Sequence, residues 1–160
     1  MIIAGIDPGT ATTGFGIVEK DGKDLKHISH GTISTDKNLA QGERLAILER
    51  GILGLVKQFK PDVMVVEKLF FFKNLKTALP VSEARGIILL TATKKKLVIE
   101  EYTPLQVKMT ICGYGRAEKQ QVQKMVQVIL KLENIPKPDD AADALAIAIC
   151  YAVENKSLKA

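Results

Sequence analysis

Acidic residues in three parts of the chain have the types and settings expected of ligands for a hard divalent cation. Asp7 follows a short apolar run at a Pro-Gly turn, and Glu67 follows another apolar run. Asp140 and Asp143 stand three residues apart at the start of an apolar C-terminal segment. Mg²⁺ takes few protein oxygens and leaves positions for water and phosphate. These carboxylates could hold two such ions about 4 Å apart, an arrangement that can cut a phosphodiester.

Each acid also has a simpler explanation. Asp7 in Asp-Pro-Gly-Thr suits an Asx turn, and Glu67 suits an ordinary exposed strand end. Asp139 or Asp140 could cap the last helix or complement its dipole. Asp143 is harder to explain in this way, because an almost wholly apolar segment follows it. We expect Asp139 to point away from the face that Asp140 and Asp143 share, and to act as the cap.

The elements that must position these acids follow from hydrophobic periodicity and turn signals. We expect strands over residues 2–6, 14–20, 24–34, 63–66 and 97–102, and helices over residues 39–59, 82–94, 104–111, 117–132 and 139–153. Pro80 marks either the start of the second helix or a kink near it. This order predicts the α/β class, with a five-stranded mixed sheet flanked by helices.

Chain direction predicts where the acids lie relative to one another. Two hairpins reverse the chain twice, so the third strand runs parallel to the first. A helical crossover then returns the chain to make the fourth strand parallel as well. The carboxyl ends of strands one and four therefore share one edge of the sheet, where ligands bind in open α/β sheets. Asp7 and Glu67 should emerge at that edge, close together if the two strands are neighbours.

The bulk composition is typical of a soluble protein, and its basic charge fits either an anionic partner or an ordinary solvated helical surface. The 160 residues carry a net charge of +5, and bases outnumber acids between Lys94 and Lys131, a pattern that suits a polyanion. No run approaches the roughly 20 apolar residues of a membrane helix, and the N-terminus does not resemble a signal peptide. Cys112 and Cys150 lack ligand spacing and suit reduced thiols. We expect one domain over residues 1–160, located in the cytoplasm and independent of membranes.

Three segments resemble the RuvC family of Holliday-junction resolvases: GIDPGTATTGFG, PDVMVVEKLFFFKN, and QVKMTICGYGRAEKQQVQKMV followed by DDAADALAIAIC. They span nearly the whole chain in the order and spacing of that family. The resemblance implies an RNase H-like fold. It also implies that the catalytic, metal-binding residues are Asp7, Glu67, Asp140 and Asp143. The family pattern D-x-x-D-A-L-A selects Asp140 rather than Asp139.

The same resemblance implies the substrate and the partners. Lys108 and Lys119 match positions linked to DNA handling, and Phe70 matches a residue that stacks on a junction base. RuvC enzymes act as homodimers on four-way DNA junctions, which they nick symmetrically in strands of like polarity. The implied cofactor is Mg²⁺, with Mn²⁺ as a plausible substitute and two ions per site. The implied partners are the RuvA and RuvB branch-migration proteins, and the implied roles are recombination and DNA repair.

Two other functions fit part of the pattern. An actin-like or sugar-kinase-like ATPase also opens with a strand and an Asp-x-Gly-Thr turn, but it needs two lobes and a second phosphate loop. A general RNase H-like nuclease acting on other branched substrates would share the acids. The resolvase-like segments outside the acids favour the junction resolvase over both.

Overall fold

A five-stranded sheet forms the centre of the computed structural model, which describes residues 1–68 and 75–155. In chain order the elements are β1 (Ile2–Asp7), β2 (Thr12–Asp21), β3 (Asp24–Ser34), α1 (Gln41–Phe59), β4 (Val63–Glu67), α2 (Leu75–Lys94), β5 (Val98–Tyr102), α3 (Pro104–Cys112), α4 (Lys119–Ile129) and α5 (Asp139–Glu154). The strand order is β3-β2-β1-β4-β5. β1 is antiparallel to β2 and parallel to β4. The predicted mixed α/β sheet is therefore confirmed.

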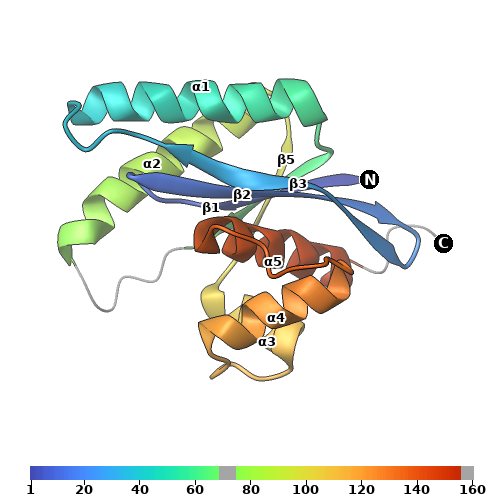
Figure 1. Ribbon diagram of the computed structural model, residues 1–160. Helices are drawn as coiled ribbons and strands as arrows, with labels where there is room; N and C mark the ends of the chain where they lie inside the picture. Colours follow the sequence, from blue (N-terminus) through green and yellow to red (C-terminus); the bar gives the residue numbers. More distant parts are fainter. Residues whose placement is uncertain (69–74, 156–160) are drawn as a thin grey trace.

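Helices cover both faces of this sheet (Figure 1). On one face, α1 and α2 pack against Ile6, Met64 and Val66. On the other face, α5 lies across the strands with α3 and α4 beyond it, and this core includes Ile3 and Val65. Each fully buried aliphatic side chain of this size contributes roughly 1.5–3 kcal/mol to stability. The sheet therefore lies between two layers of helices.

Glycines allow α5 to lie directly on β1 and β2. A Cβ added to Gly5 would overlap the backbone oxygen of Ala144, and one added to Gly14 would overlap the backbone oxygen of Asp140. A Cβ at Gly16 would likewise press on the backbone of α5. Because no side chain separates helix from sheet here, backbone contact sets the position of the first turns of α5.

Two helix boundaries differ from the sequence expectation by three residues or more. α2 begins at Leu75 and contains Pro80 within it, so Pro80 does not mark its start. A proline removes one backbone donor without necessarily ending a helix. α4 ends at Ile129, earlier than expected, because Leu130 leaves the helical conformation and Lys131 has a left-handed φ of 53°.

Two further expectations concern the environment of the chain. Cys112 and Cys150 are both free thiols, as the sequence predicts. Across residues 1–68 and 75–155, no helix combines the length and apolar character needed to cross a membrane.

Candidate active site

Asp7 and Glu67 meet at one edge of the sheet because their strands are parallel neighbours. The β1–β4 ladder ends with Ile6 opposite Val66, so the next residue of each strand is an acid. Side chains alternate between the faces of a strand, and Ile6 and Val66 both face α1 and α2. Asp7 and Glu67 therefore face α5, on the same side of the same rim. The prediction that these two residues lie close together at one edge of the sheet is confirmed.

Helix α5 brings Asp140 and Asp143 to this rim. Asp7 pairs with Gly14 in the β1–β2 ladder, and Gly14 is the residue on which the backbone of Asp140 rests. Asp143 lies almost one turn further along the same helix. The negative charges of Asp143 and Asp140 both raise the pKa of Asp7, as expected of carboxylates that share a site. The structure thus places all four predicted acids together.

Burial and repulsion from neighbouring acids raise the pKa values of Asp7, Glu67 and Asp143. Burial, followed by the charges of Glu67, Asp143 and Asp140, raises the pKa of Asp7 to about 8. Burial and Asp143 raise the pKa of Glu67 to about 7, although Lys119 and a hydrogen bond with Asp7 oppose that rise. Burial also raises the pKa of Asp143. A site of this kind is stabilised by added positive charge.

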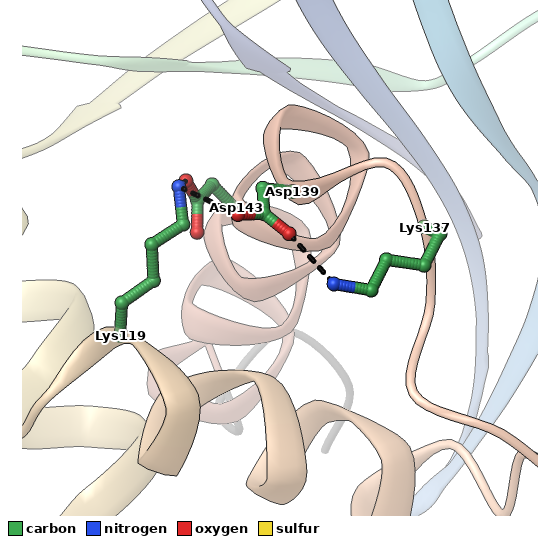
Figure 2. A network of polar contacts seen from close by, with 4 residues as sticks. All are labelled: Lys119, Lys137, Asp139 and Asp143. Atoms are coloured by element: carbon green, nitrogen blue, oxygen red, sulfur yellow. Dashed lines mark hydrogen bonds and ion pairs between the residues drawn. The ribbon is translucent and has the colours of Figure 1, made fainter.

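Lys119 supplies part of that charge and connects the site to Asp139. The ammonium of Lys119 reaches α5 from the start of α4 (Figure 2). Its Nζ lies 2.9 Å from Asp143 Oδ2 and 3.8 Å from Asp139 Oδ2. Lys137 Nζ lies 3.0 Å from Asp139 Oδ1. Burial alone would lower the pKa of Lys119, but its hydrogen bond and charge interactions with Asp143 raise that pKa overall.

The expectation for Asp139 was wrong in two respects. The N-cap of α5 is Pro138, and Asp139 is the first residue of the helix. Its side chain does not point away from the site, because it shares Lys119 with Asp143. Residues four apart on a helix lie on the same side, and the orientation of α5 turns that side toward α4.

A pocket of about 240 Å³ opens beside the acids. Glu67 and Asp143 line it together with both predicted DNA-handling lysines, Lys108 from α3 and Lys119 from α4. The rest of its lining is mainly apolar: Pro104, Val107, Val122, Ala146 and Ile147. The remaining predicted DNA-binding residue, Phe70, lies outside the described residues. The pocket therefore brings two lysine side chains next to two of the carboxylates.

The acids suit a hard cation by type, although their side chains are not yet arranged around one. Within the part of the chain that the structure describes, no three acidic, histidine or cysteine side chains are placed to hold a metal ion as they stand. Asp143 is paired with Lys119, and Asp7 interacts with Glu67. The donors at this rim are carboxylate oxygens, which Mg²⁺ prefers. The acids are therefore of the type that a hard cation prefers, and in this structure they interact with one another and with Lys119.

The raised pKa values predict how pH affects the stability of the metal-free protein. The pKa of Glu67 changes from its ordinary 4.5 to about 7, so the folded chain binds more protons between these values and loses stability as pH rises through them. In a chelating buffer at pH 8 we expect the melting temperature of Glu67→Gln to lie several degrees above that of the wild type. In a chain of this size, each kcal/mol of added stability raises the melting temperature by about 2–4 °C. At pH 4 the two should melt together. Exposed Glu133→Gln is the control, and an equal difference at both pH values would contradict the assignment.

Three contributors to the site escape sequence reasoning. Gly14 carries no chemical group, yet it permits Asp140 to approach Asp7. Gln123 is a buried polar residue beside Asp139, and Lys137 pairs with Asp139. Strand alternation places Gly5 and Asp7 on the same face of β1, and this pattern could have predicted the contact between the glycines and α5. The positions of Gln123 and Lys137 depend on how α4 packs and on the loop before α5.

A mixed sheet of this order, covered by helices on both faces and carrying carboxylates where β1, β4 and α5 meet, defines an RNase H-like nuclease. The family model for crossover junction endodeoxyribonuclease RuvC matches residues 3–151. The chain belongs to this family and is a metal-dependent endonuclease.

Relatives and a solved structure agree with this assignment over nearly the full chain. The crossover junction endodeoxyribonuclease RuvC of Thermosipho melanesiensis is 52% identical over 156 residues, covering 98% of this chain and 99% of that protein. The protein of the same name from Desulforamulus reducens is 53% identical over 152 residues, covering 95% and 93%. Thermus thermophilus RuvC in complex with a Holliday junction substrate superposes with a TM-score of 0.92 at 33% identity, covering 98% of this chain and 95% of that one.

Proposed function

We propose that this protein resolves Holliday junctions by cutting two DNA strands of like polarity at symmetric positions, as part of recombination and DNA repair. The observation that carries the proposal is the convergence of Asp7, Glu67, Asp140 and Asp143 beside a pocket that Lys108 and Lys119 also line. The structural similarity to a RuvC bound to a Holliday junction substrate supports this choice of substrate. The family assignment favours a resolvase over an ATPase.

The four acids are the proposed ligands of two Mg²⁺ ions per site, for which Mn²⁺ can substitute. When bound, such ions activate a water and stabilise the leaving oxygen of a phosphodiester. The chain itself supplies oxygen donors whose repulsion is relieved by positive charge, as the raised pKa values of Asp7 and Glu67 indicate. Asp139 is not assigned to this set, because the family pattern D-x-x-D-A-L-A selects Asp140 and Asp143.

Lysines beside the acids bind and orient the DNA in this proposal. Lys119 is hydrogen-bonded to Asp143 in this structure. If Asp143 held a cation instead, the ammonium of Lys119 would be available to contact a phosphate oxygen. Lys108 lines the same pocket from α3 and contributes sequence-independent affinity. Phe70 is proposed to stack on a base at the junction, where stacking contributes roughly 1–3 kcal/mol.

The proposed assembly is a homodimer, in which two sites act on symmetrically related strands. RuvA and RuvB are its proposed partners, the cytoplasm is its proposed location, and residues 1–160 are proposed to form one nuclease domain. The family membership supports these assignments, and the sheet shared by both hydrophobic cores supports the single domain.

A cleavage assay tests the proposed substrate. In Mg²⁺ we expect paired nicks at symmetric positions of a synthetic four-way junction, because two sites must engage strands of like polarity. A linear duplex of the same sequence should remain largely intact, with cleavage at least 100-fold slower, a difference of about 2.7 kcal/mol in activation free energy. Three-way junctions and RNA–DNA hybrids complete the set. Equal rates on the junction and the other branched substrates would instead indicate a general RNase H-like nuclease.

A further inference from the structure

A second polar pocket adjoins the carboxylate pocket on the other side of Lys119. It has a volume of about 420 Å³, and its lining is Lys119, Gln120, Gln123, Ile135, Lys137 and Asp139. Lys119 also lines the carboxylate pocket. Lys119 therefore borders both pockets, so the second pocket lies within reach of a strand whose cleaved phosphate is at the acids.

Gln123 is a buried polar side chain without a partner in this second pocket. It is 5% exposed, and within the described residues its Nε2 atom has no hydrogen-bond acceptor. The Asp139 carboxylate is near enough to interact with Gln123, but the two do not reach hydrogen-bond geometry. An unsatisfied buried amide is unfavourable, and such groups are normally paired with protein, water or ligand. The pocket therefore presents a donor that lacks an acceptor.

Two lysines complete the donor set, and at present they share the carboxylate of Asp139. Lys137 Nζ is 3.0 Å from one Asp139 oxygen and Lys119 Nζ is 3.8 Å from the other (Figure 2). The Asp139 side chain is 50% exposed, and exposed ion pairs of this kind are weak and readily exchanged. Asp139 also begins α5, and a helix N-terminus favours an anion. An external anion can therefore replace the Asp139 carboxylate here.

We propose that Lys119, Lys137 and Gln123 bind the DNA backbone phosphate next to the one that is cut, and that the Asp139 carboxylate occupies this position until DNA displaces it. The inference rests on the proposed cleavage of junction DNA at the four acids. A phosphodiester has a full negative charge and two free oxygens, so it can accept hydrogen bonds from the Gln123 amide and from an ammonium together. The subsite fixes the register of the strand relative to the carboxylates.

A methylphosphonate scan tests this subsite. Junctions are prepared with one neutral methylphosphonate at each position around the cut, and binding is measured in EDTA so that no cleavage occurs. For the wild type, one flanking position should weaken binding about tenfold, the effect expected for a charge-assisted contact. Lys137→Gln should weaken binding of the unmodified junction similarly, lower the slope of log K against log salt by about 1, and be less sensitive than the wild type to that methylphosphonate. Lys57→Gln on α1, across the sheet, should leave every value unchanged.

The variants Gln123→Leu and Asp139→Asn provide two independent tests of the subsite. Gln123→Leu should weaken junction binding about threefold with the salt slope unchanged, since it removes a neutral donor. Asp139→Asn should tighten binding, and this gain should vanish in the Lys137→Gln background. If Gln123 only packs, its variant changes the melting temperature and leaves affinity intact.

The outcomes separate this subsite from the proposed function. If the effects of Lys137→Gln and of methylphosphonate on the binding free energy add strictly at every position, the subsite is overturned. Cleavage of the unmodified junction by the wild type would still support the proposed function in that case. If the wild type does not cut the unmodified junction at all, the proposed function itself fails.

Discussion

Asp7→Asn should reduce junction cleavage about a thousandfold or more while leaving junction binding nearly intact. Asp7 lies between Glu67 on β4 and the acids of α5, and all of these charges raise its pKa. An amide retains the shape of the side chain but loses a ligand oxygen and its negative charge. The expected loss corresponds to several kcal/mol of transition-state stabilisation. Single-turnover cleavage in Mg²⁺ and binding in EDTA measure the two effects separately.

The matched control is Asp24→Asn, an exposed acid in the hairpin at the opposite end of β2. It makes the same chemical change away from the rim and should leave cleavage unchanged. The Asp7 variant should also melt above the wild type in metal-free buffer at pH 8, because it removes a buried charge. Wild-type cleavage by Asp7→Asn would exclude Asp7 from the metal ligands and with it the proposed mechanism.

Gly14→Ala should damage the site without changing any acid. Its Cβ would overlap the backbone of Asp140, so α5 must shift away from β2 and carry Asp140 and Asp143 with it. Overpacking of this type destabilises proteins by about 1–3 kcal/mol. A displacement of about 1 Å at a catalytic group can reduce the rate about 100-fold. Cleavage should be measured well below the melting temperature of the variant, so that unfolding does not account for the loss.

Gly54→Ala on α1 is the corresponding control. A Cβ at Gly54 would meet no atom within 4 Å, and alanine is favoured over glycine within a helix by about 0.5–1 kcal/mol. This variant should melt slightly higher and cut normally. Full cleavage by Gly14→Ala would show that the acids tolerate movement of α5, contrary to the close packing described above.

Strand order predicted that Asp7 and Glu67 are neighbours and helix spacing that Asp140 and Asp143 share a face, while the family resemblance joined the four acids into one site. Asp7 and Glu67 follow apolar strands that chain direction makes parallel, and the ladder ending at Ile6 and Val66 bears this out. The spacing of Asp140 and Asp143 predicts a shared helix face. The rotation of α5 about its axis was not predictable in this way, because it is set by contacts between the helix and the glycines of β1 and β2. Asp139 was misplaced for this reason.

Other features depend on packing between distant segments. Lys119 was predicted to handle DNA, but its hydrogen bond to Asp143 follows from how the start of α4 meets α5. Gln123 reads in sequence as one polar residue of an amphipathic helix, and only tertiary packing shows that it is buried. Pro80 was ambiguous because local sequence does not reveal whether neighbouring turns can continue past a missing donor.

The direct seating of α5 on the glycines of β1 and β2 has a consequence for protein engineering. A helix that rests on side chains can be raised or lowered by exchanging those side chains, whereas here the spacing is set by the main chain. Grafting the four acids onto another α/β scaffold would therefore reproduce their identities but not their separation. The unit to transplant is the pair of glycine-bearing strands together with the alanine-rich helix that they support.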